Sequence, residues 1–212
     1  MSALSSISAA APAGTSVLPG ASYKLCQPDT FANLYIQPSS DDPAIEIVSI
    51  NASVTNATEP AAACNAWPVT DPATIEVCNL TITYTHPAWH DTVNAFIHLP
   101  ASPGAWNGKL LGIGGDGWHA GNPRELPYAA ARGFVGTTTD AGHLLEKRPV
   151  AEWALNEDGT SVNWGLLRNF AGVAIAEAKK LGRAAATAFY GEEPRYAYFT
   201  VSAFTFVVCS DI

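Results

Sequence analysis

The sequence predicts an α/β fold in which a parallel β-sheet is covered by crossover helices. From residue 106 onward, short apolar runs typical of strands alternate with helical patterns, which is the arrangement of parallel sheets. The 212 residues are 48% apolar and 14% charged, a composition that suits a globular domain with a sizeable core. The chain therefore has the length of one α/β domain, or of part of a larger one.

The first third of the chain predicts little regular structure. Residues 1–22 are rich in alanine and serine and are expected to be disordered. Residues 44–50 alternate like a strand, and the stretch 51–72 is predicted to be a loop because it is rich in Asn, Ala and Pro. Residues 78–86 and 91–100 have apolar side chains at alternate positions, so they predict two antiparallel strands.

The remaining predicted elements form the parallel part of the sheet and its helices. In chain order they are a turn at Asn107–Gly108 with a strand in 106–115, a helix over 125–133 ended by Gly133, a strand over 134–140, a helix over 164–190 and a strand over 195–200. The long helix has one largely apolar face, on which Glu177 falls by spacing. Its glutamates and lysines are nevertheless expected to be solvated.

Charge and motif spacing exclude several function classes. The formal net charge of −8 comes without a basic stripe, so no nucleic-acid partner is expected. No apolar run approaches the length of a membrane span, so no membrane partner is expected either. His86 and His90 stand four residues apart, but on a strand and turn rather than on one helix face. No metal site and no cofactor are therefore assigned to this chain.

Three glycosylation patterns bear on the compartment. Asn51, Asn56 and Asn79 each begin an Asn-X-Ser/Thr pattern, and all three patterns lie between residues 51 and 81. They favour a secreted glycoprotein. The opening stretch "MSALSSISAAAPAGTSVLPG" lacks both the basic start and the apolar centre of a signal peptide. Two explanations stay open: an internal protein with unused patterns, or a true start upstream of residue 1, which we favour.

The glycine-rich stretch "GIGGDGWHAG" (112–121) is the strongest candidate site. It leaves a predicted strand at the end where ligands bind in open α/β sheets. A phosphate loop does not fit, because no lysine follows the glycines and no GxGxxG opens a helix. Two interpretations stay open: an ordinary glycine-rich turn, or an oxyanion hole built from the backbone of Gly114, Gly115, Asp116 and Gly117.

The neighbours of these glycines have paired interpretations. Trp118 either lines a binding pocket, where its ring would stack on a ligand, or packs beneath the loop. His119 either contacts substrate or is solvated, and Asp116 either orients the loop through turn hydrogen bonds or is simply exposed. His143 is expected to fasten the loop after its strand rather than to take part in catalysis.

Longer motifs resemble one known family. The segments "WNGKLLGIGGDGWHAG", "ARGFVGTTTDAGH" and "NWGLLRNFAGVAIAEAKKLGRAAATAFYGEEPRYAYF" are similar to the tannase and feruloyl esterase family over about residues 75–199. The resemblance implies an α/β-hydrolase fold. It also implies hydrolysis of small plant phenolic esters by a serine nucleophile with an aspartate and a histidine. The choice between tannins and feruloyl esters stays open.

The resemblance ends abruptly near the nucleophile. In this family the strand matching 195–200 leads into Gly-Cys-Ser-(Thr/Asn)-Gly-Gly, the sharp turn that carries the serine. This chain reads "YFTVSAFTFVVCSDI", in which Ser202 has no glycine neighbours. We therefore expect 23–200 to be the N-terminal part of an α/β-hydrolase domain that is truncated at the nucleophile elbow. Residues 201–212 are expected to be an aberrant apolar tail, and three origins stay open: a retained intron, a frameshift or a genuine end.

Such a chain is expected to be inactive by itself. The elbow serine, the triad acid and histidine, and the lid domain with the family's calcium site would all lie beyond the break. The alternative is a non-catalytic binding or regulatory fragment of the same fold.

The cysteines also take their interpretation from the resemblance. The family pairs an early cysteine with one just before the first long strand, which implies a Cys26–Cys78 disulfide. Cys64 and Cys209 have no assigned partner.

Overall fold

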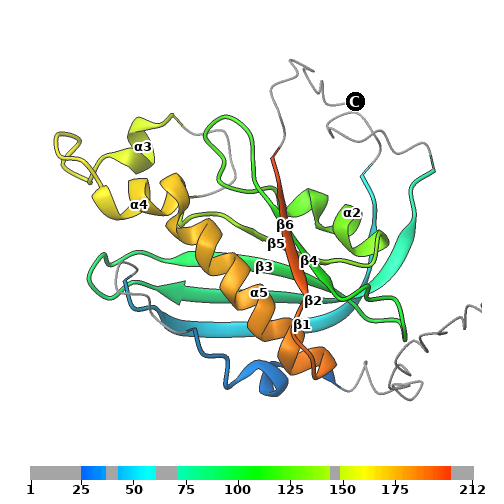
Figure 1. Ribbon diagram of the computed structural model, residues 1–212. Coiled ribbons are helices and arrows are strands. Elements are labelled where there is room, and N and C mark those ends of the chain that lie inside the picture. Colours follow the sequence, from blue (N-terminus) through cyan, green and yellow to red (C-terminus); the bar gives the residue numbers. More distant parts are fainter. Residues whose placement is uncertain (1–24, 37–42, 61–70, 144–148, 202–212) are drawn as a thin grey trace, which may run out of the picture.

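The computed structural model describes residues 25–36, 43–60, 71–143 and 149–201. Within these ranges, six strands form one sheet in the order β1-β2-β3-β5-β4-β6 (Figure 1). The strands are β1 (Glu46–Thr58), β2 (Thr74–Thr85), β3 (Val93–Pro100), β4 (Lys109–Ile113), β5 (Val135–Thr139) and β6 (Tyr196–Thr200). The helical elements are η1 (Pro28–Phe31), η2 (Pro123–Glu125), α2 (Leu126–Ala131), α3 (Ala151–Ala154), α4 (Trp164–Arg168), η3 (Asn169–Val173) and α5 (Ala174–Tyr190).

The first half of the sheet is antiparallel, as predicted from residues 78–86 and 91–100. β2 pairs with both β1 and β3, and Leu80 lies opposite Ala52 on one side and Ile97 on the other. The alternating apolar positions Leu80, Ile82 and Ile97 are fully buried in the main core. The alternation of apolar residues along these strands therefore predicted correctly which face of the sheet is buried.

The predicted loop over 51–72 is wrong for its first eight residues, because β1 continues to Thr58. This strand lies at the edge of the sheet and exposes most of its side chains. Its sequence therefore shows little of the apolar alternation that predicts a half-buried strand. Its asparagine and alanine residues contribute to the loop prediction. On an edge strand they are compatible with pairing, since β2 supplies the backbone partners from Glu46 through Thr58.

The second half of the sheet is parallel, as predicted. β4 pairs in parallel with β5 and with β6, so that Gly112 lies between Thr137 and Phe199. β5 in turn pairs antiparallel with β3 and joins the two halves. The predicted helix over 125–133 is present as η2 and α2, and the chain leaves it through Gly133 at φ 75°. The carboxyl ends of β4, β5 and β6 therefore meet at one edge of the sheet.

Helices cover both faces of the sheet. Neighbouring residues of one strand point to opposite faces, and Leu110 and Leu111 of β4 show which helix covers each. Leu110 packs in the main core with Leu181 of α5, whereas Leu111 packs with Leu126 of α2. Figure 1 shows α5 running across the sheet. The parallel part of the sheet is thus covered on both faces.

The helix predicted over 164–190 is interrupted, and one of its glutamates is buried. α4 and α5 are separated by the π-helical turn η3, in which Gly172 has a φ of 153° that is not helical. Glu177 of α5 is 2% exposed, so the expectation that the helix glutamates are all solvated is wrong for this residue. Glu177 packs against the end of β2, where polar partners satisfy its carboxylate.

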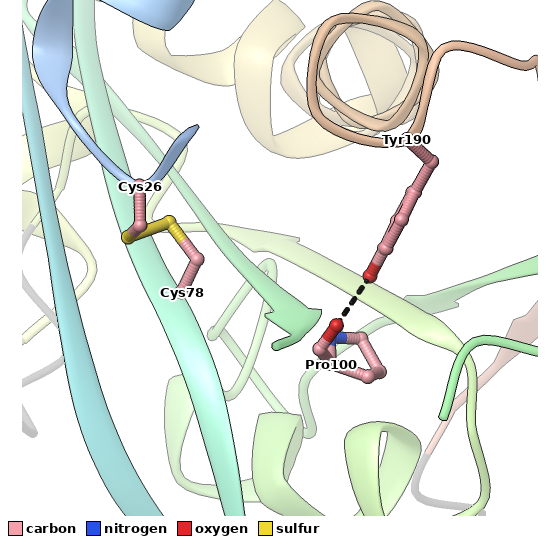
Figure 2. Close-up of a disulfide and its surroundings, with 4 residues drawn as sticks. All are labelled: Cys26, Cys78, Pro100 and Tyr190. Atoms are coloured by element: carbon pink, nitrogen blue, oxygen red, sulfur yellow. Dashed lines mark hydrogen bonds between the residues drawn. A yellow bond between two sulfur atoms is a disulfide. The ribbon is translucent and has the colours of Figure 1, made fainter. Parts of the chain in front are cut away.

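The disulfide between Cys26 and Cys78 is present and ties the N-terminal segment to β2 (Figure 2). Next to it, Phe31 of η1 is fully buried and stacks on Phe189 at a centroid distance of 6.4 Å. In the same core, the Tyr190 hydroxyl donates to the carbonyl of Pro100 at 2.9 Å, which Figure 2 also shows. Cys64 and Cys209 lie outside the described residues.

The glycosylation patterns lie on strands. Asn51 and Asn56 are exposed on the edge strand β1, and Asn79 is half-buried on β2. Among the residues placed by the structure, no helix is both long enough and apolar enough to cross a membrane. The surface of β1 therefore leaves two of the three asparagines open to modification.

Candidate functional site

The glycine loop, residues 114–121, lies at the C-terminal edge of the parallel strands. At its base the Gly114 N–H donates to the carbonyl of Thr200 at 2.8 Å. At its far end the Asn122 N–H donates to the Thr138 hydroxyl at 3.0 Å, and that hydroxyl donates to the carbonyl of Ile113 at 2.7 Å. Both ends of the loop are therefore fixed to neighbouring strands.

Part of the glycine content serves the packing of the chain against itself. A Cβ atom at Gly121 would overlap the Thr138 hydroxyl and approach the Thr139 carbonyl oxygen to 2.5 Å. A Cβ at Gly115 would overlap the carbonyl of His119. Gly115 is thus required by close approach within the loop, and Gly121 by close approach of the loop to β5. They do not by themselves indicate a ligand.

The backbone donors divide the four predicted oxyanion residues into two pairs. The N–H groups of Gly114 and Gly115 already donate within the chain, to Thr200 and to Ala120. The N–H groups of Asp116 and Gly117 donate to no acceptor among the described residues. Gly117 has a φ of 55°, and a Cβ there would meet nothing within 4 Å. The free donors therefore lie at the open tip of the loop.

The tip itself is a closed turn. The His119 N–H donates to the carbonyl of Asp116 at 2.9 Å, and the His119 ring lies 3.4 Å from the Asp116 carboxylate. The Asp116 side chain is 75% exposed and makes no buried contact, so Asp116 shapes the turn through its backbone carbonyl. His119 is less exposed than Asp116 and shares the same open side of the loop.

Four rings beside the loop form the aromatic cluster: Trp118, His143, Trp153 and Phe170. Phe170 lies at its centre, with centroid distances of 5.7 Å to Trp118, 5.8 Å to His143 and 5.5 Å to Trp153. His143 stacks on Trp153 at 4.1 Å. Trp118 is 56% exposed, so one part of its ring packs on the cluster while the rest faces solvent. The packing interpretation of Trp118 therefore holds for one part of its ring, and the interpretation that it lines a binding pocket stays a prediction.

His143 fastens the glycine loop from the next loop along the sheet edge. Its Nε2 lies 2.9 Å from the carbonyl of Trp118. A carbonyl can only accept, so Nε2 carries the proton in this contact. Burial lowers the pKa of His143 and outweighs the contacts that raise it, which favours the neutral ring. The structure thus supports the prediction that His143 holds a loop, and it extends the contact to the glycine loop.

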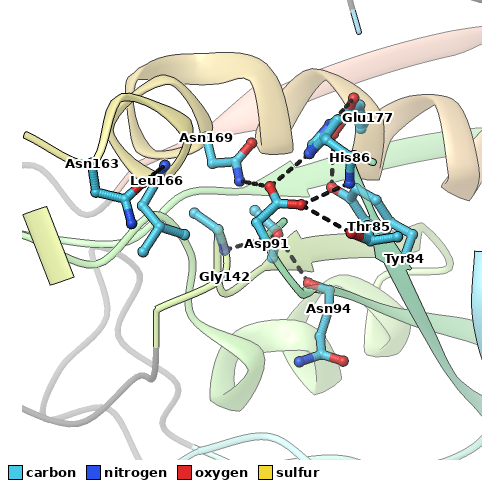
Figure 3. A network of polar contacts seen from close by, with 12 residues as sticks. Tyr84, Thr85, His86, Asp91, Asn94, Gly142, Asn163, Leu166, Asn169 and Glu177 are labelled. Atoms are coloured by element: carbon cyan, nitrogen blue, oxygen red, sulfur yellow. Dashed lines mark hydrogen bonds and ion pairs between the residues drawn. The ribbon is translucent and has the colours of Figure 1, made fainter. Parts of the chain in front are cut away.

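A second polar group lies deeper, at the end of β2. We call it the buried ion cluster, and it consists of Tyr84, His86, Asp91, Asn169 and Glu177 (Figure 3). The His86 ring contacts Asp91 at 2.7 Å through Nδ1 and Glu177 at 2.9 Å through Nε2. The Tyr84 hydroxyl donates to Glu177 at 2.9 Å, and the Asn169 amide donates to Asp91 at 2.7 Å. His86 and Asn169 are fully buried.

The charges of this cluster stabilise one another. Burial lowers the pKa of His86, but the hydrogen bonds of its ring to Asp91 and Glu177, together with their charges, outweigh burial and raise the pKa to about 9. Burial raises the pKa of Asp91, but its hydrogen bonds with His86 and Asn169 lower it further, below its usual value. His86 is therefore a buried cation between two carboxylates at neutral pH.

Sequence reasoning missed this cluster, although two signals were present. His86 continues the inward alternation of Ile82 and Tyr84 along β2, and Glu177 falls on the apolar face of its helix. His90, by contrast, is exposed on the following turn, where its backbone N–H donates to the His86 carbonyl at 3.1 Å and its ring is not a member of the cluster. In the described part of the chain, no group of three or more His, Cys, Asp or Glu side chains is arranged to hold a metal ion.

The described residues contain serines and histidines but bring none of them together. Within these residues no serine hydroxyl is hydrogen-bonded to a histidine, and the Ser161 hydroxyl donates to Asp158 instead. Ser202 lies outside the described residues. What this part of the molecule presents is a fixed loop with two free backbone donors beside a half-exposed tryptophan.

Comparisons with known proteins point in one direction. The model of the tannase and feruloyl esterase family matches residues 78–203. A probable feruloyl esterase from Arthroderma benhamiae is 37% identical over 127 residues, which are 59% of this chain and 23% of the relative. A tannase from Aspergillus oryzae is 30% identical over 119 residues, 56% of this chain and 20% of the relative.

Solved structures give the same picture of the fold. A tannin acyl hydrolase from Aspergillus niger superposes with a TM-score of 0.67 at 25% identity, over 84% of this chain and 32% of that one. Feruloyl esterase B from Aspergillus oryzae superposes with a TM-score of 0.57 at 17% identity, over 85% of this chain and 32% of that one. The predicted α/β-hydrolase type of fold is confirmed. The chain spans less than a quarter of the curated relatives and about a third of these structures.

Proposed function

Because this chain belongs to the tannase and feruloyl esterase family, we propose that it forms part of a serine carboxylic ester hydrolase that acts on plant phenolic esters. One observation carries the proposal. Among the described residues, the N–H groups of Asp116 and Gly117 have no acceptor, and they lie at the tip of a loop whose base is fixed to β4, β5 and β6. In α/β hydrolases, one oxyanion donor comes from the loop after the strand equivalent to β4.

The two N–H groups would act on the transition state of acyl transfer. When a nucleophile adds to the ester carbonyl, negative charge develops on the carbonyl oxygen, and donors already aimed at it need no reorganisation. The closed turn from Asp116 to His119 holds them in place. Removal of one such donor costs about 3 kcal/mol of transition-state stabilisation. The exposed part of the Trp118 ring would offer an apolar surface to the phenolic ring of the substrate.

In this proposal, the described residues contribute the sheet and the oxyanion donors. The serine nucleophile, with its aspartate and histidine, lies outside them, so the described part does not hydrolyse esters by itself. The proposal requires no cofactor from the described residues. It leaves open whether a galloyl or a feruloyl group occupies the site.

We also propose that the protein is secreted. The Cys26–Cys78 disulfide supports this, because such bonds persist in oxidising compartments. The exposure of Asn51 and Asn56 on β1 supports it as well, since glycans are added to accessible asparagines. Expression in a fungal secretory host followed by intact-mass analysis tests this. Intracellular retention, or a secreted product in which Cys26 and Cys78 are both free thiols, contradicts it.

The enzymatic proposal is tested in a chimera. Residues 78–200 of this chain replace the aligned segment of the feruloyl esterase from Arthroderma benhamiae, and hydrolysis of methyl ferulate and methyl gallate is measured. We expect turnover of at least one ester, and the preferred ester identifies the acyl group. The variant Asp116→Pro removes one free N–H and should lower kcat about a hundredfold. The matched variant Asp116→Ala keeps that N–H.

Two results contradict the proposal. One is a chimera with a native circular dichroism spectrum that hydrolyses neither ester. The other is equal kcat in Asp116→Pro and Asp116→Ala, which would remove this loop from the oxyanion site.

A further inference from the structure

Asn169 lies where the buried ion cluster and the aromatic cluster meet. It is the first residue of the π-helical turn η3 (Asn169–Val173), and Phe170 follows it directly. We propose that Asn169 is a positioning residue for the glycine loop: it fixes η3 to the end of β2 and thereby holds Phe170 against Trp118 and His143. The catalytic meaning of this role rests on the function proposed above, whereas the positioning itself does not.

The fixed end of this path is Asp91. Its carboxylate accepts from the His86 backbone N–H and contacts the His86 ring, each at 2.7 Å, in addition to accepting from Asn169. The Thr85 hydroxyl donates to it at 3.4 Å. Figure 3 shows these contacts converging on Asp91 from β2 and from η3. Because the Asp91 side chain is 2% exposed, water does not compete for the Asn169 bond.

The structure of η3 explains why a side-chain anchor is needed there. A π-helical turn inside a helix is uncommon and is frequently found at functional sites. Gly172 within it has a φ of 153°, so the backbone ladder of α5 does not continue regularly through the turn. The Asn169 side chain is fully buried, and its Oδ1 has no hydrogen-bond partner among the described residues, so the bond from Nδ2 to Asp91 orients the amide.

The other end of the path is the glycine loop. Phe170 lies at the centre of the aromatic cluster and contacts the rings of both Trp118 and His143. His143 also holds the carbonyl of Trp118 through its Nε2. Trp118 follows Gly117 in the chain, so its ring and its carbonyl set the orientation of the turn that carries the free donors. A shift of η3 would therefore loosen this turn without unfolding the sheet.

The test uses hydrogen exchange measured by NMR on the full 212-residue chain. The reporters are the Gly115 and His119 amides, each hydrogen-bonded inside the loop, and the Nε2–H of His143. Asn169→Leu keeps the side-chain size and removes the donor. The control is Leu181→Ala, which removes packing from the same core but changes none of the residues of the path. Both variants are also melted thermally.

We expect Asn169→Leu to speed exchange of both loop amides about tenfold or more, while amides of β2 and β3 change much less. The His143 Nε2–H signal should broaden or disappear. Leu181→Ala should speed exchange across the sheet without favouring the loop. Phe170→Leu, at a half-buried position, should reproduce the local effect of Asn169→Leu, and it replaces that variant if Asn169→Leu does not fold.

Two results overturn the proposal. The first is loop exchange in Asn169→Leu that rises no more than exchange in β2, which is the pattern of a merely structural residue. The second is an unchanged His143 signal and unchanged loop exchange in Phe170→Leu. Neither result depends on ester hydrolysis, so the positioning role and the enzymatic proposal fail separately.

Discussion

Loss of the Cys26–Cys78 disulfide should destabilise the fold strongly. The bond closes a loop with a sequence separation of 52 residues. In the loop-entropy model, the cross-link then contributes about 4 kcal/mol by restricting the unfolded chain. Both half-cystines are buried, at 6% and 0% exposure, so the double variant Cys26→Ala/Cys78→Ala also loses some packing. The expected loss in free energy of unfolding is therefore about 4 kcal/mol or slightly more.

Urea denaturation followed by circular dichroism measures this loss. For an m value of about 2 kcal/mol/M, the midpoint should fall by about 2 M. The unmutated protein under reducing conditions is the control, because it keeps both sulfur atoms and loses only the bond. Equal midpoints in the reduced protein and the double variant would assign the effect to the cross-link. A fall of less than about 0.5 M in both would refute the reasoning, since the N-terminal segment would then not be pinned by the bond.

Three further predictions concern the buried ion cluster and the glycine loop. Glu177→Ala should lower the free energy of unfolding by about 3–5 kcal/mol, measured in urea at pH 7, because it leaves the buried His86 cation with one carboxylate partner. A loss below about 1 kcal/mol contradicts this prediction. The pKa of His86 is raised from its usual 6.5 to about 9, so its stabilisation is complete below about pH 6.5 and is lost as pH rises through 9. Between pH 6 and 10, the free energy of unfolding measured in urea should fall by on the order of 3 kcal/mol in the unmutated protein but not in His86→Gln. A free energy of unfolding that does not change with pH in the unmutated protein contradicts the prediction. Gly121→Ala should lower the melting temperature more than Gly117→Ala, because only the Gly121 Cβ would overlap the Thr138 hydroxyl; the reverse order would mean that the φ of 55° at Gly117 dominates.

Local periodicity carried most of the fold prediction. The strands β2 to β6 and the helix α2 lie where the alternation and helical spacing placed them, because each element buries one face and so shows its own period. Two predictions failed where this signal is weak or misleading. The edge strand β1 buries little and reads as a loop after residue 50, and the helical pattern over 164–190 runs through η3 without a visible break.

The sequence by itself determined the sheet, the position of the glycine loop and, through a family resemblance, the disulfide. Only the tertiary structure decided which loop N–H groups are free and which side chains form the buried ion cluster. The reason is that the spacing of apolar residues along a helix or strand indicates which face of that element is buried, but not which other element packs on that face. Glu177 and Tyr84 are 93 positions apart, and their hydrogen bond exists because α5 crosses the end of β2. Asp116 and Gly114 are two positions apart, yet only Gly114 meets a neighbouring strand, so chain proximity could not separate the engaged donor from the free one.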